Sequence, residues 1–123
     1  MSYQPRRGRS PSLLAFMGGL LSASSVGLSA YAAHAVADAH LQSNLQSAAL
    51  FAFGNGIALA ALSGNTTRGL GRVALYLILL GTLLFSGSLV LNAFFDIATG
   101  LAPIGGISMM CGWTLWAIDA LRR

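Results

Sequence analysis

The chain has 123 residues, of which 55% are hydrophobic and 8% charged, with a net charge of +4. This is a single-domain length with too little charge to cover a water-soluble globule, which excludes a soluble enzyme domain and a disordered tail. A lone cysteine excludes a scaffold of internal disulfides. A bilayer core of about 30 Å takes about 20 helical residues per crossing, so four crossings leave room only for short ends and loops. The composition therefore predicts a membrane protein.

The first two apolar segments are separated by a short polar stretch. No charged residue occurs between Arg9 and Asp38, and the stretch at about 13–33 is long enough to cross a bilayer as a helix. The second span is expected at about 45–62, between polar residues on either side. We expect a basic segment over 1–12 to precede these helices.

The second half of the chain contains two further apolar segments. The third span, at about 73–95, is the most apolar and contains the unbroken run 75–80. The fourth, at about 101–118, carries Pro103 in its first turn, where a missing N–H does least harm. We predict an all-α fold, an antiparallel four-helix transmembrane bundle over 13–121 with a basic end at 122–123.

All seven basic residues are arginines, in three groups that each border an apolar segment: Arg6, Arg7 and Arg9; Arg68 and Arg72; Arg122 and Arg123. Four crossings place every arginine on one side, and the opposite side holds only Asp38, Asp96, His34 and His40. The positive-inside rule then predicts cytoplasmic N- and C-termini and a multi-pass protein of the cell inner membrane. This grouping argues against nucleic-acid binding, which uses clustered basic patches.

The first segment also has features of a cleavable signal peptide. Basic residues, an apolar stretch and small residues around Ala30–Ala35 fit that alternative. The apolar stretch is at the upper end of signal-peptide lengths, which favours a retained helix.

Small residues at four-residue spacing allow membrane helices to approach closely. In the first segment Gly19, Ala23 and Gly27 share one stripe, which predicts that this helix lies at the centre of the bundle. The other predicted packing positions are Ser86, Gly87, Ser88, Gly105 and Gly106.

A candidate polar site comprises His34, Asp38 and Asn55. His34 and Asp38 are one helical turn apart and could share a helical face. A metal site needs three or four suitably spaced ligands, so we expect no metal or cofactor here. We expect instead an interfacial cap, in which these residues form hydrogen bonds with loops at the outer surface. For Asn55, near the middle of the second span, we expect a hydrogen bond to a serine or a backbone carbonyl of a neighbouring helix. Cys111 is expected to be buried and inert, and Trp113 to lie near the inner boundary with Trp116.

Three short motifs resemble those of the YgdD-like small membrane proteins. Residues 28–35 resemble Gly-Ala-Phe-Gly-Ala-His-Ala, residues 84–89 resemble Leu-Phe-Ser-Gly-Ser-Leu, and residues 103–106 with Gly112 and Trp113 resemble Pro-Ile-Gly-Gly and Gly-Trp. The resemblance spans about Leu14 to Leu121. The family, which includes the eukaryotic transmembrane protein 256 type, implies four membrane helices and no assigned function, and by analogy it implies an organellar membrane as the alternative to a bacterial-type inner membrane. Its members typically carry Tyr-His where this chain has Gly54 and Asn55, which favours a structural role here.

Three functions remain open from the sequence. The first is a non-catalytic accessory subunit of a larger membrane complex, such as a respiratory one, in contact with membrane lipids and with other subunits or with copies of itself. The second is an independent carrier or binder of a small molecule or lipid, lined by Asn55 and the serines of the first helix. The third, which we disfavour, is an enzyme that uses His34 with Asp38 or Asp96.

Overall fold

The computed structural model describes residues 12–66 and 69–122. They form four helices and, within those ranges, no strand: α1 (Leu13–Ala35), α2 (Ala39–Leu62), α3 (Gly69–Phe95) and α4 (Ala102–Arg122). Each helix is long and apolar enough to cross a membrane. The prediction of an all-α protein with four membrane helices is therefore confirmed.

Side-chain caps set where α1 and α2 begin. The Ser12 hydroxyl accepts a hydrogen bond from the Ala15 N–H at 3.2 Å. The Asp38 carboxylate accepts two, from the N–H groups of His40 and Leu41, at 2.9 and 3.0 Å. These contacts satisfy N–H groups that have no partner within the helix. Because Asp38 is the cap, α2 begins at Ala39, before the apolar span expected at about 45–62.

The turn between α3 and α4 depends on a residue in the left-handed region. Asp96 has a φ of 56° and follows the last residue of α3, a conformation that Asp and Asn tolerate better than most residues. The Asn92 side chain donates to the Ile97 carbonyl at 2.9 Å and holds the chain as it leaves the helix. α4 then starts at Ala102 with Pro103 in its first turn, as expected.

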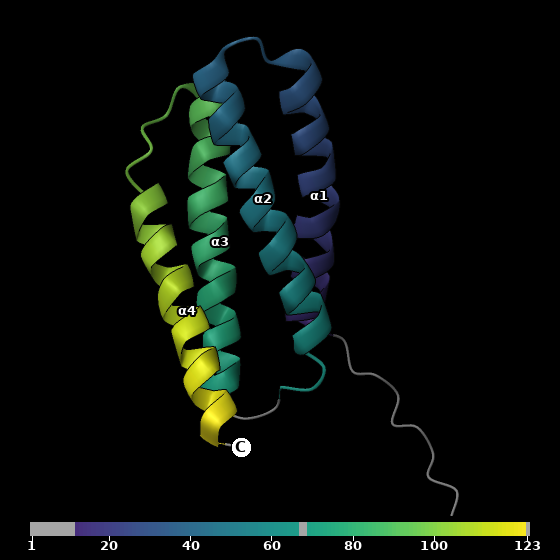
Figure 1. The fold of residues 1–123 in the computed structure, drawn as a ribbon, viewed down its shortest axis with the longest axis vertical. Coiled ribbons are helices and arrows are strands. Elements are labelled where there is room, and N and C mark those ends of the chain that lie inside the picture. Colours follow the sequence, from purple (N-terminus) through teal and green to yellow (C-terminus); the bar gives the residue numbers. More distant parts are fainter. Residues whose placement is uncertain (1–11, 67–68, 123) are drawn as a thin grey trace, which may run out of the picture.

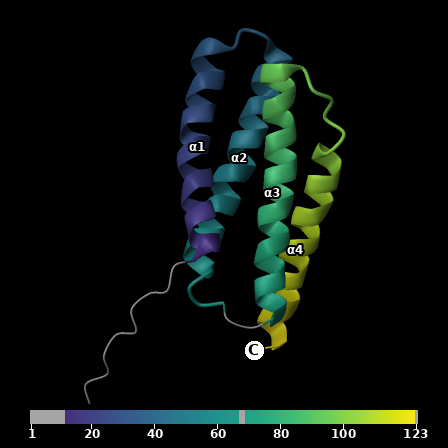
Figure 2. The same cartoon turned by 180° about the vertical axis from the view of Figure 1, so that it is seen from behind.

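The helices form two pairs. The most extensive interfaces are those of α1 with α2 and of α3 with α4, and the interface between α2 and α3 is smaller. The α1–α2 and α3–α4 connections lie at one end of the molecule, the upper end in Figure 1, and α4 finishes at the lower end. The expectation that α1 is central is wrong, because α1 meets α3 only briefly and α2 and α3 form the middle of the molecule (Figure 2).

Two apolar clusters fill the interior. The first joins α1, α2 and α3 through Leu14, Leu59, Leu75, Ile78 and Leu79. The second joins α2, α3 and α4 through Ala48, Leu89 and Ala102. Since both clusters contain residues of α2 and α3, these two helices connect the pairs.

Candidate functional site

Glycine contacts hold each helix pair together. In α1, a Cβ at Gly18 would lie 2.5 Å from the Gly56 carbonyl oxygen, so the α1 and α2 backbones touch there. In α4, a Cβ at Gly105 would lie 2.6 Å from the Gly81 carbonyl oxygen and would also strike the Phe85 nitrogen. Gly112 approaches the Ala74 carbonyl of α3 in the same way. In lipid there is no hydrophobic driving force between helices, so close backbone contacts of this kind stabilise each pair.

The predicted packing residues divide into two groups. Gly105 packs against α3, and Ser86 and Ser88 are buried. A Cβ would meet nothing within 4 Å at Gly19, Gly27, Gly87 or Gly106, and Ala23 is exposed, so the stripe expected to pack α1 is uncovered in this chain. Adjacent helical residues point about 100° apart, and α1 is rotated so that Gly18 rather than Gly19 faces α2.

Asn55 is the centre of a buried polar junction between α2, α3 and α4. Its amide donates to the Thr82 hydroxyl at 2.9 Å and to the Met109 sulfur at 3.0 Å. Its carbonyl accepts from the Trp113 indole N–H at 3.1 Å. Trp113, which is 36% exposed, is therefore tied to Asn55 by its indole N–H, a partner that the sequence did not indicate. Asn55 is only 6% exposed. Because lipid offers no hydrogen-bonding groups, these three bonds supply the partners that water would otherwise give the amide.

Hydroxyl groups add further links between helices. Ser86 of α3 donates to the Ala48 carbonyl of α2 at 2.8 Å, and Ser108 of α4 donates to the Leu77 carbonyl of α3 at 2.9 Å. Within the described ranges, the buried hydroxyls of Ser63 and Ser88 have no hydrogen-bond partner. Side-chain hydrogen bonds thus link α2 to α3 as well as α3 to α4, whereas the close glycine contacts described above lie within the two pairs.

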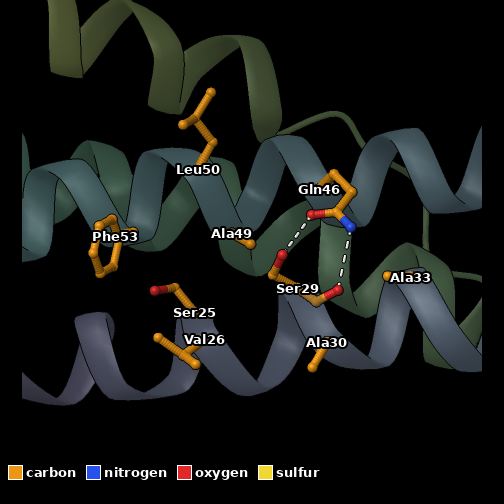
Figure 3. Close-up of a pocket in the computed structure, with 9 residues that line it drawn as sticks. All are labelled: Ser25, Val26, Ser29, Ala30, Ala33, Gln46, Ala49, Leu50 and Phe53. Carbon is orange, nitrogen blue, oxygen red and sulfur yellow. Dashed lines mark hydrogen bonds between the residues drawn. The ribbon is translucent and has the colours of Figure 1, made fainter.

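A groove of about 500 Å³ lies on the outer side of α1 and α2. Gln46 and Ser29 bridge it by two bonds, because the Ser29 hydroxyl donates to the Gln46 carbonyl at 2.8 Å and the Gln46 amide donates to the Ser29 backbone carbonyl at 3.2 Å. Figure 3 shows this pair beside the apolar side chains of Val26, Leu50 and Phe53. The polar atoms of the bridge are engaged with each other, so the groove presents a mainly apolar lining.

The histidines and acids of the upper end do not assemble into a metal site. α1 ends at Ala35 and Asp38 caps α2, so His34 and Asp38 do not share the helical face that their spacing suggests. His34, Asp38, His40 and Asp96 are all exposed. Among the described residues, no group of three or more His, Cys, Asp or Glu side chains is placed to hold a metal ion.

Two residues occupy positions that the sequence did not indicate. Cys111 is exposed on α4 rather than buried, because Gly112 takes the position facing α3. Asp119 is buried near the end of α4, and a Cβ at Gly71 of α3 would lie 3.0 Å from its carboxylate. The absence of a side chain at Gly71 therefore makes room for the only acid at the lower end of the molecule.

Comparison with known proteins places this architecture in a family. No curated protein and no solved structure matches the chain. A family model described as "Protein of unknown function (DUF423)" matches residues 28–106, more than half of the chain. The match contains the motifs at 28–35, 84–89 and 103–106, and it is consistent with the resemblance to the YgdD-like proteins. With its four apolar helices and this match, the chain belongs to the DUF423 family.

Proposed function

We propose that this protein is a non-catalytic accessory subunit of a larger membrane assembly. The observation that carries this proposal is the uncovered stripe of Gly19, Ala23 and Gly27 on α1. In the same chain, Gly18 and Gly56 show what such small residues do when a partner is present, since they bring two helix backbones into contact. A second helix docked on the stripe would gain the same close approach.

The proposal includes an orientation in the membrane. We propose four antiparallel crossings of an inner membrane, with both termini in the cytoplasm. The support is the distribution of arginine, since no arginine lies between Arg9 and Arg68 or between Arg72 and Arg122. Both connections at the upper end fall within these arginine-free intervals, as expected of loops on the non-cytoplasmic side.

The test is native-gel migration after mild detergent extraction at natural expression level, with mass spectrometry of the co-migrating proteins. We expect wild-type protein in an assembly that contains other membrane proteins. Ala23→Leu, which fills the stripe, should release this chain from that assembly.

The matched control is Gly54→Leu, which adds the same side chain at an exposed glycine of α2 with open space around it. This variant should stay in the assembly. Migration of the wild-type protein alone, or only with copies of itself as a species of about one to four chains, would overturn the accessory role.

A further inference from the structure

Two hollows meet along the side of the molecule where α1 and α3 face each other across α2. One, of about 430 Å³, runs between α1 and α3 with Ala52 of α2 among its lining residues. The other, of about 280 Å³, lies at the upper end and includes Asp38. Tyr31 and Phe94 line both hollows, and their ring centroids are 5.4 Å apart. Figure 2 shows α1 and α3 on either side of α2 on this face. We call the two hollows together the α1–α3 seam.

The upper hollow has the chemistry of a cation site. Asp38 is held in place because its carboxylate accepts hydrogen bonds from the N–H groups of His40 and Leu41. Tyr31 and Phe94 add two aromatic rings, which attract cations through their π faces. No arginine or lysine occurs in the helix connections at this end, residues 36–38 and 96–101.

The hollow of about 430 Å³ between α1 and α3, which we call the groove, has the chemistry and the length of an acyl-chain site. Glycines on opposite walls, Gly27 and Gly87, leave open space where side chains would otherwise stand. The hydroxyls of Ser25, Thr82 and Ser86 line the groove but donate to backbone carbonyls. Ser24 adds one exposed hydroxyl, and the rest of the lining is mainly apolar.

The extent of the groove along α1 matches one leaflet of a bilayer. It runs from Tyr31 down to Leu21, which is about 15 Å of helix at 1.5 Å per residue. Half of a hydrocarbon core of about 30 Å is also about 15 Å. Below this point the seam is closed, because Leu21 packs against the cluster that contains Leu14.

We propose that the α1–α3 seam binds one bilayer phospholipid with an ammonium headgroup. The headgroup lies in the upper hollow beside Asp38, Tyr31 and Phe94, and an acyl chain lies in the groove between Gly27 and Gly87. The order of an anionic and aromatic hollow followed by an apolar groove is the order of such a lipid from head to tail. The seam shares Gly27 with the uncovered stripe of α1, but Gly19 and Ala23 do not line it, so the lipid proposal does not depend on the packing role of Ala23.

The groove is tested by Gly87→Leu, which fills it where the structure has open space. Delipidated protein in a nonionic detergent is mixed with dioleoylphosphatidylethanolamine, and the retained lipid is counted by native mass spectrometry. We expect one lipid per wild-type chain and about tenfold weaker retention by Gly87→Leu, because the acyl chain loses its buried position. Gly27→Leu, from the opposite wall, should have the same effect, and Gly54→Leu should retain lipid as the wild type does.

The headgroup is tested by Asp38→Asn, which keeps a good helix cap and removes the charge. The wild type should prefer dioleoylphosphatidylethanolamine or dioleoylphosphatidylcholine to dioleoylphosphatidylglycerol by up to about fivefold, the upper end of the range for exposed charge pairs. Asp38→Asn should abolish this preference, and Asp96→Asn, at an acid outside the seam, should preserve it. Equal retention of phosphatidylglycerol by the wild type, or unchanged retention of lipid by both groove variants when their helical content and melting match the wild type, would overturn the proposal.

Discussion

At the residue scale, the function of a polar side chain inside this protein follows from its partners. Asn55 was expected to bind a serine or a backbone carbonyl, and it binds the side chains of Thr82, Met109 and Trp113. These partners are 27, 54 and 58 residues away in the chain. The junction therefore connects three helices at one point, which suits a structural role for Asn55.

Replacing Asn55 by alanine should lower the stability of the protein. The change removes three hydrogen bonds and leaves the Trp113 indole N–H without its acceptor, and we expect a loss of about 2 kcal/mol in the free energy of unfolding. Thermal unfolding of the purified protein in detergent measures the effect. Asn65→Ala, at an exposed asparagine beyond α2, serves as the control, and equal melting of the two variants would contradict this role.

At the scale of the element, neighbouring glycines have opposite environments. A Cβ at Gly105 would collide with the α3 backbone, whereas one at Gly106, the next residue, would meet nothing within 4 Å. Gly18 and Gly19 in α1 differ in the same way. Each helix therefore has one glycine face that packs inside the chain and another that is open, and the open faces are the ones on which both of our proposals depend.

The adjacent pair in α4 provides a direct test. Gly105→Ala should cost about 2 kcal/mol because the added methyl group forces α3 and α4 apart. Gly106→Ala should be neutral or stabilising by up to about 1 kcal/mol, since alanine favours a helix more than glycine does. Parallel unfolding measurements decide the matter, and a Gly105→Ala variant as stable as Gly106→Ala would show that α3 and α4 do not approach at this glycine.

At the scale of the whole molecule, two glycine-packed pairs are joined by an interface of a different kind. The α2–α3 interface uses apolar side chains and the hydrogen bonds of Asn55 and Ser86. α1 lies at the edge of this arrangement and has little contact with α3. The most open faces of the molecule are consequently on α1, where we place both the partner subunit and one wall of the lipid site.

The proposed orientation predicts how reporters behave at the two ends of the molecule. A fluorescent reporter that matures only in the cytoplasm, fused after Arg123, should give signal because the arginines hold that end inside. The same reporter inserted after Ile97, in the connection between α3 and α4, should be dark. A dark fusion at Arg123 with confirmed expression would reverse the orientation.

Several features of the candidate sites were not predictable from the sequence. The sequence did not indicate Trp113 as a partner of Asn55, and Cys111 was expected to be buried and is exposed. Both features have the same origin, because the apolar pattern of a membrane helix does not indicate which of its faces meets protein and which meets lipid. Asp38 was expected to belong to a polar cap with His34, and its role as the cap of α2 depends on where α1 stops.

By itself the sequence determined the number and approximate position of the helices, and the family through its short motifs. It could do so because a membrane helix needs a continuous apolar segment, which is a local property of the chain. Only the tertiary structure decided which glycines pack, which partners Asn55 takes and where the α1–α3 seam opens. These depend on the rotation of each helix about its own axis, and a rotation of about 100° exchanges Gly18 for Gly19 while leaving the hydropathy of the segment unchanged.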